Sequence, residues 1–243
     1  MRSRGRYAPS PTGTLHLGNL RTALLAWLFA RAAGGAFILR MEDLDAPRVR
    51  PGAASQLLAD LRWLGLDWDE GPDVGGPLGP YTQSARQAIY AAALAQLRAD
   101  DLVYPCYCTR AELRARHEES GVASAPHGME SVSTVVCPCR GLTYAEQRMR
   151  EVAGRRPAWR FHTPSEPVTF TDRIIGAVTQ RPTDAGDFIV RRSDGLFAYH
   201  LAVVIDDALM GITQVVRGAD LSPFVAAQQA LCLALGYSPP REY

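Results

Sequence analysis

The chain has 243 residues, of which 47% are hydrophobic and 21% are charged, as is typical of a soluble globular enzyme. Its formal net charge of +1 means that any nucleic-acid binding must depend on local clusters of positive charge. No apolar run reaches the ~20 residues that a membrane-spanning helix needs, and the basic N-terminus lacks the apolar region of a signal peptide. We therefore expect a cytoplasmic protein with no membrane partner, and we expect it to be a monomer.

The first 100 residues have a pattern of alternating strands and helices. Short strands are expected at 6–8 and 37–39, and Pro/Gly-rich loops at 9–14 and 71–80. The expected helices are at 17–33, with leucines at helical spacing, and at 51–64 and 84–97. A strand, a helix and a second strand in this order favour a parallel sheet.

The pattern changes after residue 100. We expect a short strand at 103–108 and two short helices that open on capping boxes, Thr109 with Glu112 and Thr143 with Glu146. An apolar run at 201–205 and a helix at 224–235 then restore the first pattern. The predicted fold is α/β, with a Rossmann-like, doubly wound parallel sheet. The expected parts are a first half of the core at 1–100, an α+β insertion at 101–190 and a second half of the core at 191–243.

The loop after the first strand has the features of a phosphate-binding segment. It ends at the start of a helix, where free backbone N–H groups and the positive helix end can receive phosphates. Gly13 and Gly18 would let a nucleotide approach the backbone closely. His16 can donate to a phosphate oxygen as charge builds during attack at the α-phosphorus. Alone, a His-x-Gly sequence is more often a plain strand–loop–helix turn.

Several segments in order resemble the motifs of class I aminoacyl-tRNA synthetases of the glutamyl and glutaminyl type. His16-Leu17-Gly18-Asn19 is similar to their HIGH signature, and residues 6–13 look like the block that precedes it. Further matching blocks occur at 41–45, 199–207 and 216–221. The resemblance covers essentially the whole chain. It implies a ligase that uses ATP, with Mg²⁺, to activate glutamate.

Within this family the chain most resembles the glutamyl-queuosine tRNA(Asp) synthetases. Ala219 stands where glutamyl-tRNA synthetases usually have an acidic residue, and residues 194–199 have the form found in the queuosine enzymes. The resemblance implies that glutamate is transferred to queuosine in the anticodon wobble position of tRNA(Asp). The implied partners are glutamate, ATP and the anticodon stem-loop that carries queuosine.

The resemblance also implies which residues form the active site. Glutamate has two carboxylates and one ammonium group, so its pocket needs cationic donors and an acid, and these are expected at strand ends. The residues implied to bind glutamate are Arg6, Tyr7, Ala8, Pro9, Ser10, Glu42, Tyr199 and Arg217. Those implied to bind ATP are Pro9, Thr12, Gly13, His16 and Gly18, and the implied catalytic residues are His16, Gly18 and Asn19.

Four of the five cysteines form two Cys-x-Cys pairs, which in a cytoplasmic chain suggest a metal site rather than disulfides. The expected ligands of a structural, tetrahedral Zn²⁺ are Cys106, Cys108, Cys137 and Cys139. The family often has a tyrosine ligand at the position of Val135, for which Cys137 is the natural substitute. Tyr144 and His127 are the alternative fourth ligands, and small buried cysteines without a metal are the alternative to the whole site. Cys232, on an apolar helix face, is expected in the core.

Two groups of arginines fall in or beside the predicted insertion. They could contact an RNA backbone, although a run of arginines on a helix more often faces solvent. The groups are Arg110, Arg114 and Arg116, and Arg148, Arg150, Arg155, Arg156 and Arg160.

The family's second signature is a KMSKS-like loop whose lysines steady the ATP phosphates. This chain has no lysine, and we interpret it as a fragment that ends before that loop. Two other functions stay open. One is the N-terminal catalytic part of a glutamyl-tRNA synthetase, which charges the tRNA 3′ end. The other is a non-catalytic module that binds nucleotide or RNA.

Overall fold

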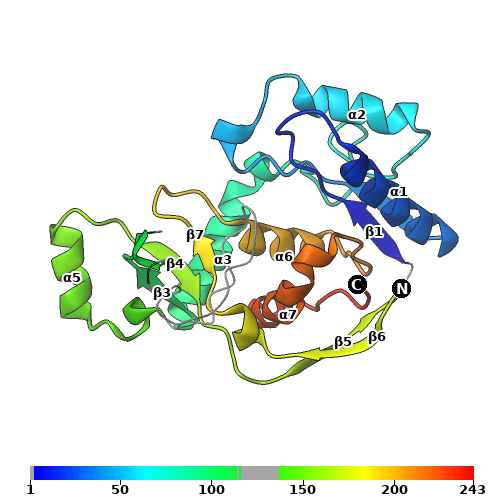
Figure 1. The fold of residues 1–243 in the computed structure, drawn as a ribbon. Coiled ribbons are helices and arrows are strands. Elements are labelled where there is room, and N and C mark those ends of the chain that lie inside the picture. The colour runs from blue at the N-terminus through cyan, green and yellow to red at the C-terminus, as the bar shows by residue number, and fades with distance from the viewer. Residues whose placement is uncertain (1–2, 110, 114, 116–136) are drawn as a thin grey trace.

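The computed structural model describes residues 3–109, 111–113, 115 and 137–243 (Figure 1). Its central sheet contains two parallel strands, β1 (Arg4–Tyr7) and β2 (Ala36–Leu39), which are connected by helix α1 (Leu17–Ala32). The predicted strand–helix–strand unit is therefore confirmed. The strand boundaries differ from the expected ones by one or two residues, as is common for element ends.

Residues from the C-terminal part of the chain extend the same sheet. Gly5 of β1 forms a parallel bridge with Gln214, and Gln214 forms another with Glu242. Glu242 in turn bridges to β5 (Val168–Asp172), which pairs with β6 (Gly176–Gln180) in an antiparallel hairpin. The hairpin therefore pairs with the core sheet, although it lies within the segment 101–190.

A separate antiparallel sheet has the strand order β3–β4–β7. In Figure 1 this sheet and helix α5 lie at the opposite end of the molecule from β1 and α1. The bounds are β3 (Val103–Cys106), β4 (Ala158–Phe161), β7 (Ile189–Arg191) and α5 (Tyr144–Val152). Both predicted capping boxes form: the Thr143 and Thr109 hydroxyls accept from the backbone amides of Glu146 and Glu112.

Further helices cover the sheet and fill the space between the two sheets. They are α2 (Ala53–Trp63), α3 (Gln87–Ala99), α6 (Tyr199–Leu209) and α7 (Val225–Ala234), with short 3₁₀ turns η1 (Ala46–Arg48), η2 (Gln83–Arg86), η3 (Pro138–Gly141), η4 (Pro182–Ala185) and η5 (Ala219–Phe224). The apolar run at 201–205 lies in α6, whose residues 200–207 are all buried between α3 and α7. In the described part of the chain, no helix is long and apolar enough to cross a membrane.

The contact between α1 and β1 is made by small residues. Ala23, Ala26 and Ala30 are the buried residues of α1, whereas Leu17 is 82% exposed. A Cβ atom at Gly5 would lie 3.0 Å from the Ala30 Cβ, so helix and strand approach closely because neither carries a large side chain there. The leucine spacing correctly indicates a helix, but the buried face is the alanine face.

Candidate active site

β1 and the segment around Gln214 run side by side, and their carboxyl ends carry the two arginines predicted to bind glutamate. Arg6 Nη1 donates to the carbonyl oxygen of Val216 at 3.2 Å. The bond ties the end of β1 to the residue that precedes Arg217. Arg6 and Arg217 therefore start from the same edge of the sheet, where the sequence predicts a ligand site.

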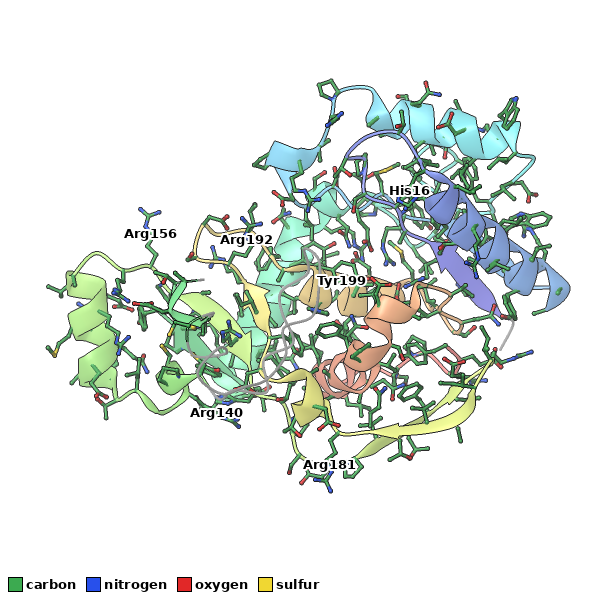
Figure 2. The ribbon with its side chains drawn as sticks, in the orientation of Figure 1. His16, Arg140, Arg156, Arg181, Arg192 and Tyr199 are labelled. Atoms are coloured by element: carbon green, nitrogen blue, oxygen red, sulfur yellow. The ribbon has the colours of Figure 1, made fainter. Side chains whose placement is uncertain are left out.

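Glu42 and Tyr199 reach the same place from two other elements. Glu42 follows β2 and is buried, and Tyr199 is the first residue of α6, near the centre of the molecule in Figure 2. Burial raises the pKa of the Tyr199 hydroxyl, and the Glu42 carboxylate adds to this effect, whereas the cations of Arg217 and Arg6 oppose it. Effects of this kind require short distances. The structure thus brings these four predicted residues together.

A buried network of charges holds Arg6 and Glu42 in place. Arg6 Nε lies 3.2 Å from Asp207 Oδ1, and Arg40 Nη1 lies 2.7 Å from the same oxygen. Arg40 Nη2 donates to Glu42 Oε1 at 3.1 Å. Arg40 is fully buried, where a guanidinium is tolerated only if carboxylates pair with it. The orientations of Arg6 and Glu42 are therefore coupled through Arg40 and Asp207.

The two carboxylates of the network differ in acidity. Burial by itself would raise the pKa of Asp207, but the guanidinium groups of Arg6 and Arg40 outweigh it, and the pKa lies below its usual value. For Glu42 burial outweighs the effect of Arg40, and the pKa is raised. Asp207 is thus the fixed anion of the site, and the charge of Glu42 would be stabilised by an incoming cation.

The guanidinium of Arg217 has one paired and one unpaired nitrogen among the described residues. Its Nη1 donates to Gln228 Oε1 at 2.7 Å. Its Nη2 is buried and has no hydrogen-bond partner within the described residues. A buried N–H group is usually paired, because leaving it unpaired is unfavourable. The unpaired nitrogen therefore fits the acceptor of a ligand, such as a carboxylate oxygen.

His16 is exposed and caps helix α1. Its Nδ1 accepts from the Gly18 amide at 3.1 Å, and Asn19 Oδ1 accepts from the His16 amide at 3.2 Å. A Cβ atom on Gly18 would lie 2.9 Å from His16 Cε1, so the cap needs glycine there. In the neutral imidazole the proton must then sit on Nε2, which is left to donate to an anion at the helix N-terminus.

The residues between Arg6 and the helix differ in burial. Tyr7 packs in the core cluster of α1 and α2, because successive side chains of β1 alternate and Arg6 takes the opposite face. Burial raises the pKa of Tyr7 to about 12, so its hydroxyl stays protonated. Ala8, Thr12 and Gly13 are half-buried, Pro9 is buried, and Ser10 is exposed.

The cysteines of the two Cys-x-Cys pairs come together between β3 and η3. The Cys137 Sγ lies 3.4 Å from the Cys106 Sγ and 3.9 Å from the Cys108 Sγ. The Cys108 and Cys139 sulfurs are 3.6 Å apart, and all four are free thiols. Sulfurs bonded to Zn²⁺ at about 2.3 Å in a tetrahedron lie about 3.8 Å apart. The cluster therefore has the donor set and spacing of a tetrahedral metal site.

The other cysteine-related expectations fall into two groups. Cys232 is buried in the core on α7, as predicted. Tyr144, an alternative ligand, is 76% exposed at the start of α5. Val135 and His127 lie outside the described residues.

The arginines predicted to meet RNA differ in availability. Arg160 is buried and donates to a backbone carbonyl, while Arg148 and Arg155 pair with glutamates. Arg156 is exposed and projects outward from the turn after α5 in Figure 2. Arg110, Arg114 and Arg116 lie outside the described residues.

Sequence patterns missed three residues of this site: Arg40, Asp207 and Gln228. Asp207 belongs to a matched block, but nothing local shows that its partners come from two strands distant in sequence. The available signal was an arginine directly after a buried strand and two acids inside an apolar helical run. Charged residues in such places are buried only when they are paired.

The model of the family described as tRNA synthetases class I (E and Q), catalytic domain, matches residues 3–243. The chain belongs to this family. The match includes the His16 segment and the Arg217 segment, so both halves of the site lie within the synthetase catalytic domain.

Similar proteins carry two kinds of name. A "Glutamyl-Q tRNA(Asp) synthetase" from Symbiobacterium thermophilum is 56% identical over 97% of this chain and 72% of its own length. A "Glutamate--tRNA ligase 2" from Syntrophus aciditrophicus is 48% identical over 98% of this chain, which spans 48% of that protein. The crystal structure of a glutamate tRNA ligase from Elizabethkingia meningosepticum, in complex with its amino acid, has a TM-score of 0.83 and 36% identity. It covers 100% of this chain, which spans 49% of that structure. The α/β fold is therefore that of the class I synthetase catalytic domain.

Proposed function

We propose that this chain carries the catalytic centre of an enzyme that activates L-glutamate with ATP and transfers it to queuosine at the wobble position of tRNA(Asp). The observation that carries the proposal is the meeting of Arg6, Glu42, Tyr199 and Arg217 at one edge of the sheet. Membership of the synthetase family and 56% identity to a glutamyl-Q tRNA(Asp) synthetase support it.

The pocket matches the charges of glutamate. Arg6 and Arg217 supply cationic donors for the side-chain carboxylate, and the unpaired Nη2 of Arg217 is one of them. Glu42 accepts from the substrate ammonium. Burial raises the pKa of Glu42, and the positive charge of the ammonium stabilises its ionised form. A neutral side chain would leave the cationic donors unpaired, so the set selects an acidic amino acid.

Activation takes place where this pocket meets the N-terminus of α1. A carboxylate oxygen of glutamate attacks the α-phosphorus of ATP, forming glutamyl-adenylate and releasing pyrophosphate. Mg²⁺ enters with ATP as part of the substrate. His16 Nε2 donates to a phosphate oxygen as charge develops, while the Gly18 amide holds the imidazole and Asn19 Oδ1 accepts from the His16 backbone amide. Pro9, Thr12 and Gly13 line the approach of the nucleotide. A hydroxyl of queuosine then attacks the glutamyl carbonyl, and AMP leaves.

We also propose that the four-cysteine cluster holds a structural Zn²⁺. The metal would supply no chemistry to the reaction; it would cross-link β3 to η3. The backbone amide of Tyr107 donates to Cys139 Sγ at 3.4 Å, a contact that stabilises the thiolate form that a metal requires. Cys137 takes the place of the tyrosine ligand that the family often has.

Two other functions are weighed against this proposal. The catalytic part of a glutamyl-tRNA synthetase would use the same pocket, and the 48% identity to a glutamate–tRNA ligase favours it, but the identity is lower than to the glutamyl-Q enzyme. A non-catalytic nucleotide or RNA module would not need the buried pairs that hold Arg6 and Glu42.

The deciding experiment tests the activation of glutamate by ATP and then follows labelled glutamate from the adenylate to RNA. Glutamate-dependent ATP–pyrophosphate exchange on the full-length protein tests activation, and a non-catalytic module would show none. The protein is then incubated with tRNA(Asp) with and without queuosine, and with an anticodon stem-loop that carries it. Label on the queuosine stem-loop supports the proposal. Label on the 3′ terminal adenosine, with modified and unmodified tRNA equally good, would replace it with the glutamyl-tRNA synthetase function.

A further inference from the structure

Arg217 is the first member of a buried chain of hydrogen bonds that runs from the site into the core. Its Nη1 lies 2.7 Å from Gln228 Oε1, and Gln228 Nε2 lies 3.0 Å from His200 Nδ1. Gln228 is 6% exposed and His200 is 5% exposed. None of these contacts involves the residues that form the catalytic signature.

The hydrogen bonds from Arg217 through Gln228 to His200 can form with only one orientation of the Gln228 amide. A guanidinium has donors and no acceptor, so the Gln228 amide must turn its oxygen toward Arg217. Its nitrogen then faces His200, and Nδ1 of the imidazole must accept. His200 therefore carries its proton on Nε2. A reversed amide would place an NH₂ group against the guanidinium and lose the bond to Arg217.

The surroundings of His200 keep its imidazole neutral, as this orientation of the Gln228 amide requires. Its ring packs against the rings of Phe188, Tyr199 and Phe224, at centroid distances of 5.1, 5.4 and 4.7 Å. Burial, helped by the nearby cation of Arg217, lowers the pKa of His200 to about 3, so the imidazole stays neutral at ordinary pH. If Nδ1 were protonated, two hydrogen-bond donors would face each other and the bond to the Gln228 nitrogen would be lost.

We propose that Gln228 and His200 are positioning residues that set the specificity of the site for an acidic substrate. They fix Arg217 through a hydrogen bond to Nη1. The unpaired Nη2 is then free to donate to a carboxylate oxygen of the substrate. A free arginine side chain loses rotamer freedom when it binds, and a pre-oriented one does not. The inference rests on the proposed function, because it takes glutamate as the ligand.

The test is a calorimetric measurement of glutamate, glutamine and ATP binding to the wild type and three variants. Gln228→Met keeps a side chain of similar volume and removes both hydrogen bonds. His200→Phe keeps an aromatic ring and removes the Nδ1 acceptor. Gln214→Met is the matched control, because Gln214 is also buried and its amide nitrogen donates to Glu242 instead.

We expect Gln228→Met to weaken glutamate binding about tenfold and His200→Phe about threefold, because the first loses a bond to a charged group. ATP binding and the weak binding of glutamine should change less than twofold, so the preference for glutamate falls. Gln214→Met should keep the wild-type preference for glutamate over glutamine. Unchanged glutamate binding by Gln228→Met would overturn the inference, as would parallel losses for all three ligands. A wild type that binds glutamine as well as glutamate would overturn the proposed function itself.

Discussion

Arg40 Nη1 lies 2.7 Å from Asp207 Oδ1, and this buried pair joins the end of β2 to helix α6. The same guanidinium approaches Glu42 Oε1 at 3.1 Å and Asp206 Oδ2 at 3.6 Å. Arg40 thus pairs with three carboxylates, one of which belongs to Glu42, a residue predicted to bind glutamate. The Arg40–Asp207 pair therefore contributes both to the stability of the fold and to the geometry of the pocket.

Replacing Arg40 should therefore be costly. Arg40→Met leaves Asp207 and Glu42 buried with less compensation, and we expect the free energy of unfolding to fall by about 3–5 kcal/mol. Arg148→Met is the control, because Arg148 is 57% exposed and pairs with Glu151 on the surface. It should cost at most about 1 kcal/mol. Urea denaturation of both variants measures the difference, and equal losses would contradict the role given to Arg40.

The lowered pKa of Asp207 makes a prediction about pH. Its folded-state pKa lies below that of the unfolded chain, so the ionised carboxylate stabilises the fold above the ordinary aspartate pKa of about 3.9. That contribution is lost as the pH falls through the lower, folded-state value. The difference in unfolding free energy between the wild type and Asp207→Asn should therefore be larger at pH 7 than near pH 3. A difference that does not change with pH would mean that the carboxyl is not held ionised.

Local patterns were sufficient for most of the secondary structure. The helices expected at 17–33, 51–64, 84–97 and 224–235 and the first two strands all form, because each depends on the apolar spacing of its own residues. Local patterns could not assign the run at 201–205. A helix buried on every side has no polar face, so its residues carry no periodic signal.

The sequence predicts those site residues that lie in recognisable motifs. It does not predict those that are brought together only by the tertiary structure. Arg6, Glu42, Tyr199 and Arg217 were identified from the resemblance, and they converge. Arg40 and Asp207 are far apart in sequence, and only the parallel order of β1 and β2 against α6 brings them together. Pairing of this kind is a property of tertiary structure.

Arg217 gives a direct test of substrate selection. A charge-assisted contact with a carboxylate is worth roughly 1.5–3 kcal/mol, so Arg217→Ala should raise the glutamate concentration needed by about tenfold or more. The requirement for ATP should change little, because His16 and the start of α1 are untouched. Arg192→Ala is the control: Arg192 is half-buried, and it pairs with Asp45 and Asp194 rather than with the residues predicted to bind glutamate. Equal effects of the two variants on pyrophosphate exchange would argue against a contact between Arg217 and glutamate.

The cysteine cluster predicts a metal content and its loss on substitution. Metal analysis of protein freed of loosely bound ions should give about one Zn²⁺ per chain, as four-coordinate cysteine sites do. Cys108→Ser should lower both the zinc content and the melting temperature, because the Cys108 Sγ lies within 3.9 Å of two other sulfurs of the cluster. Cys232→Ser removes a buried free thiol outside the cluster and should keep the full zinc content. Full occupancy after loss of Cys137 would instead assign the fourth position to Tyr144 or His127, and a wild type without zinc would leave the four thiols as core residues.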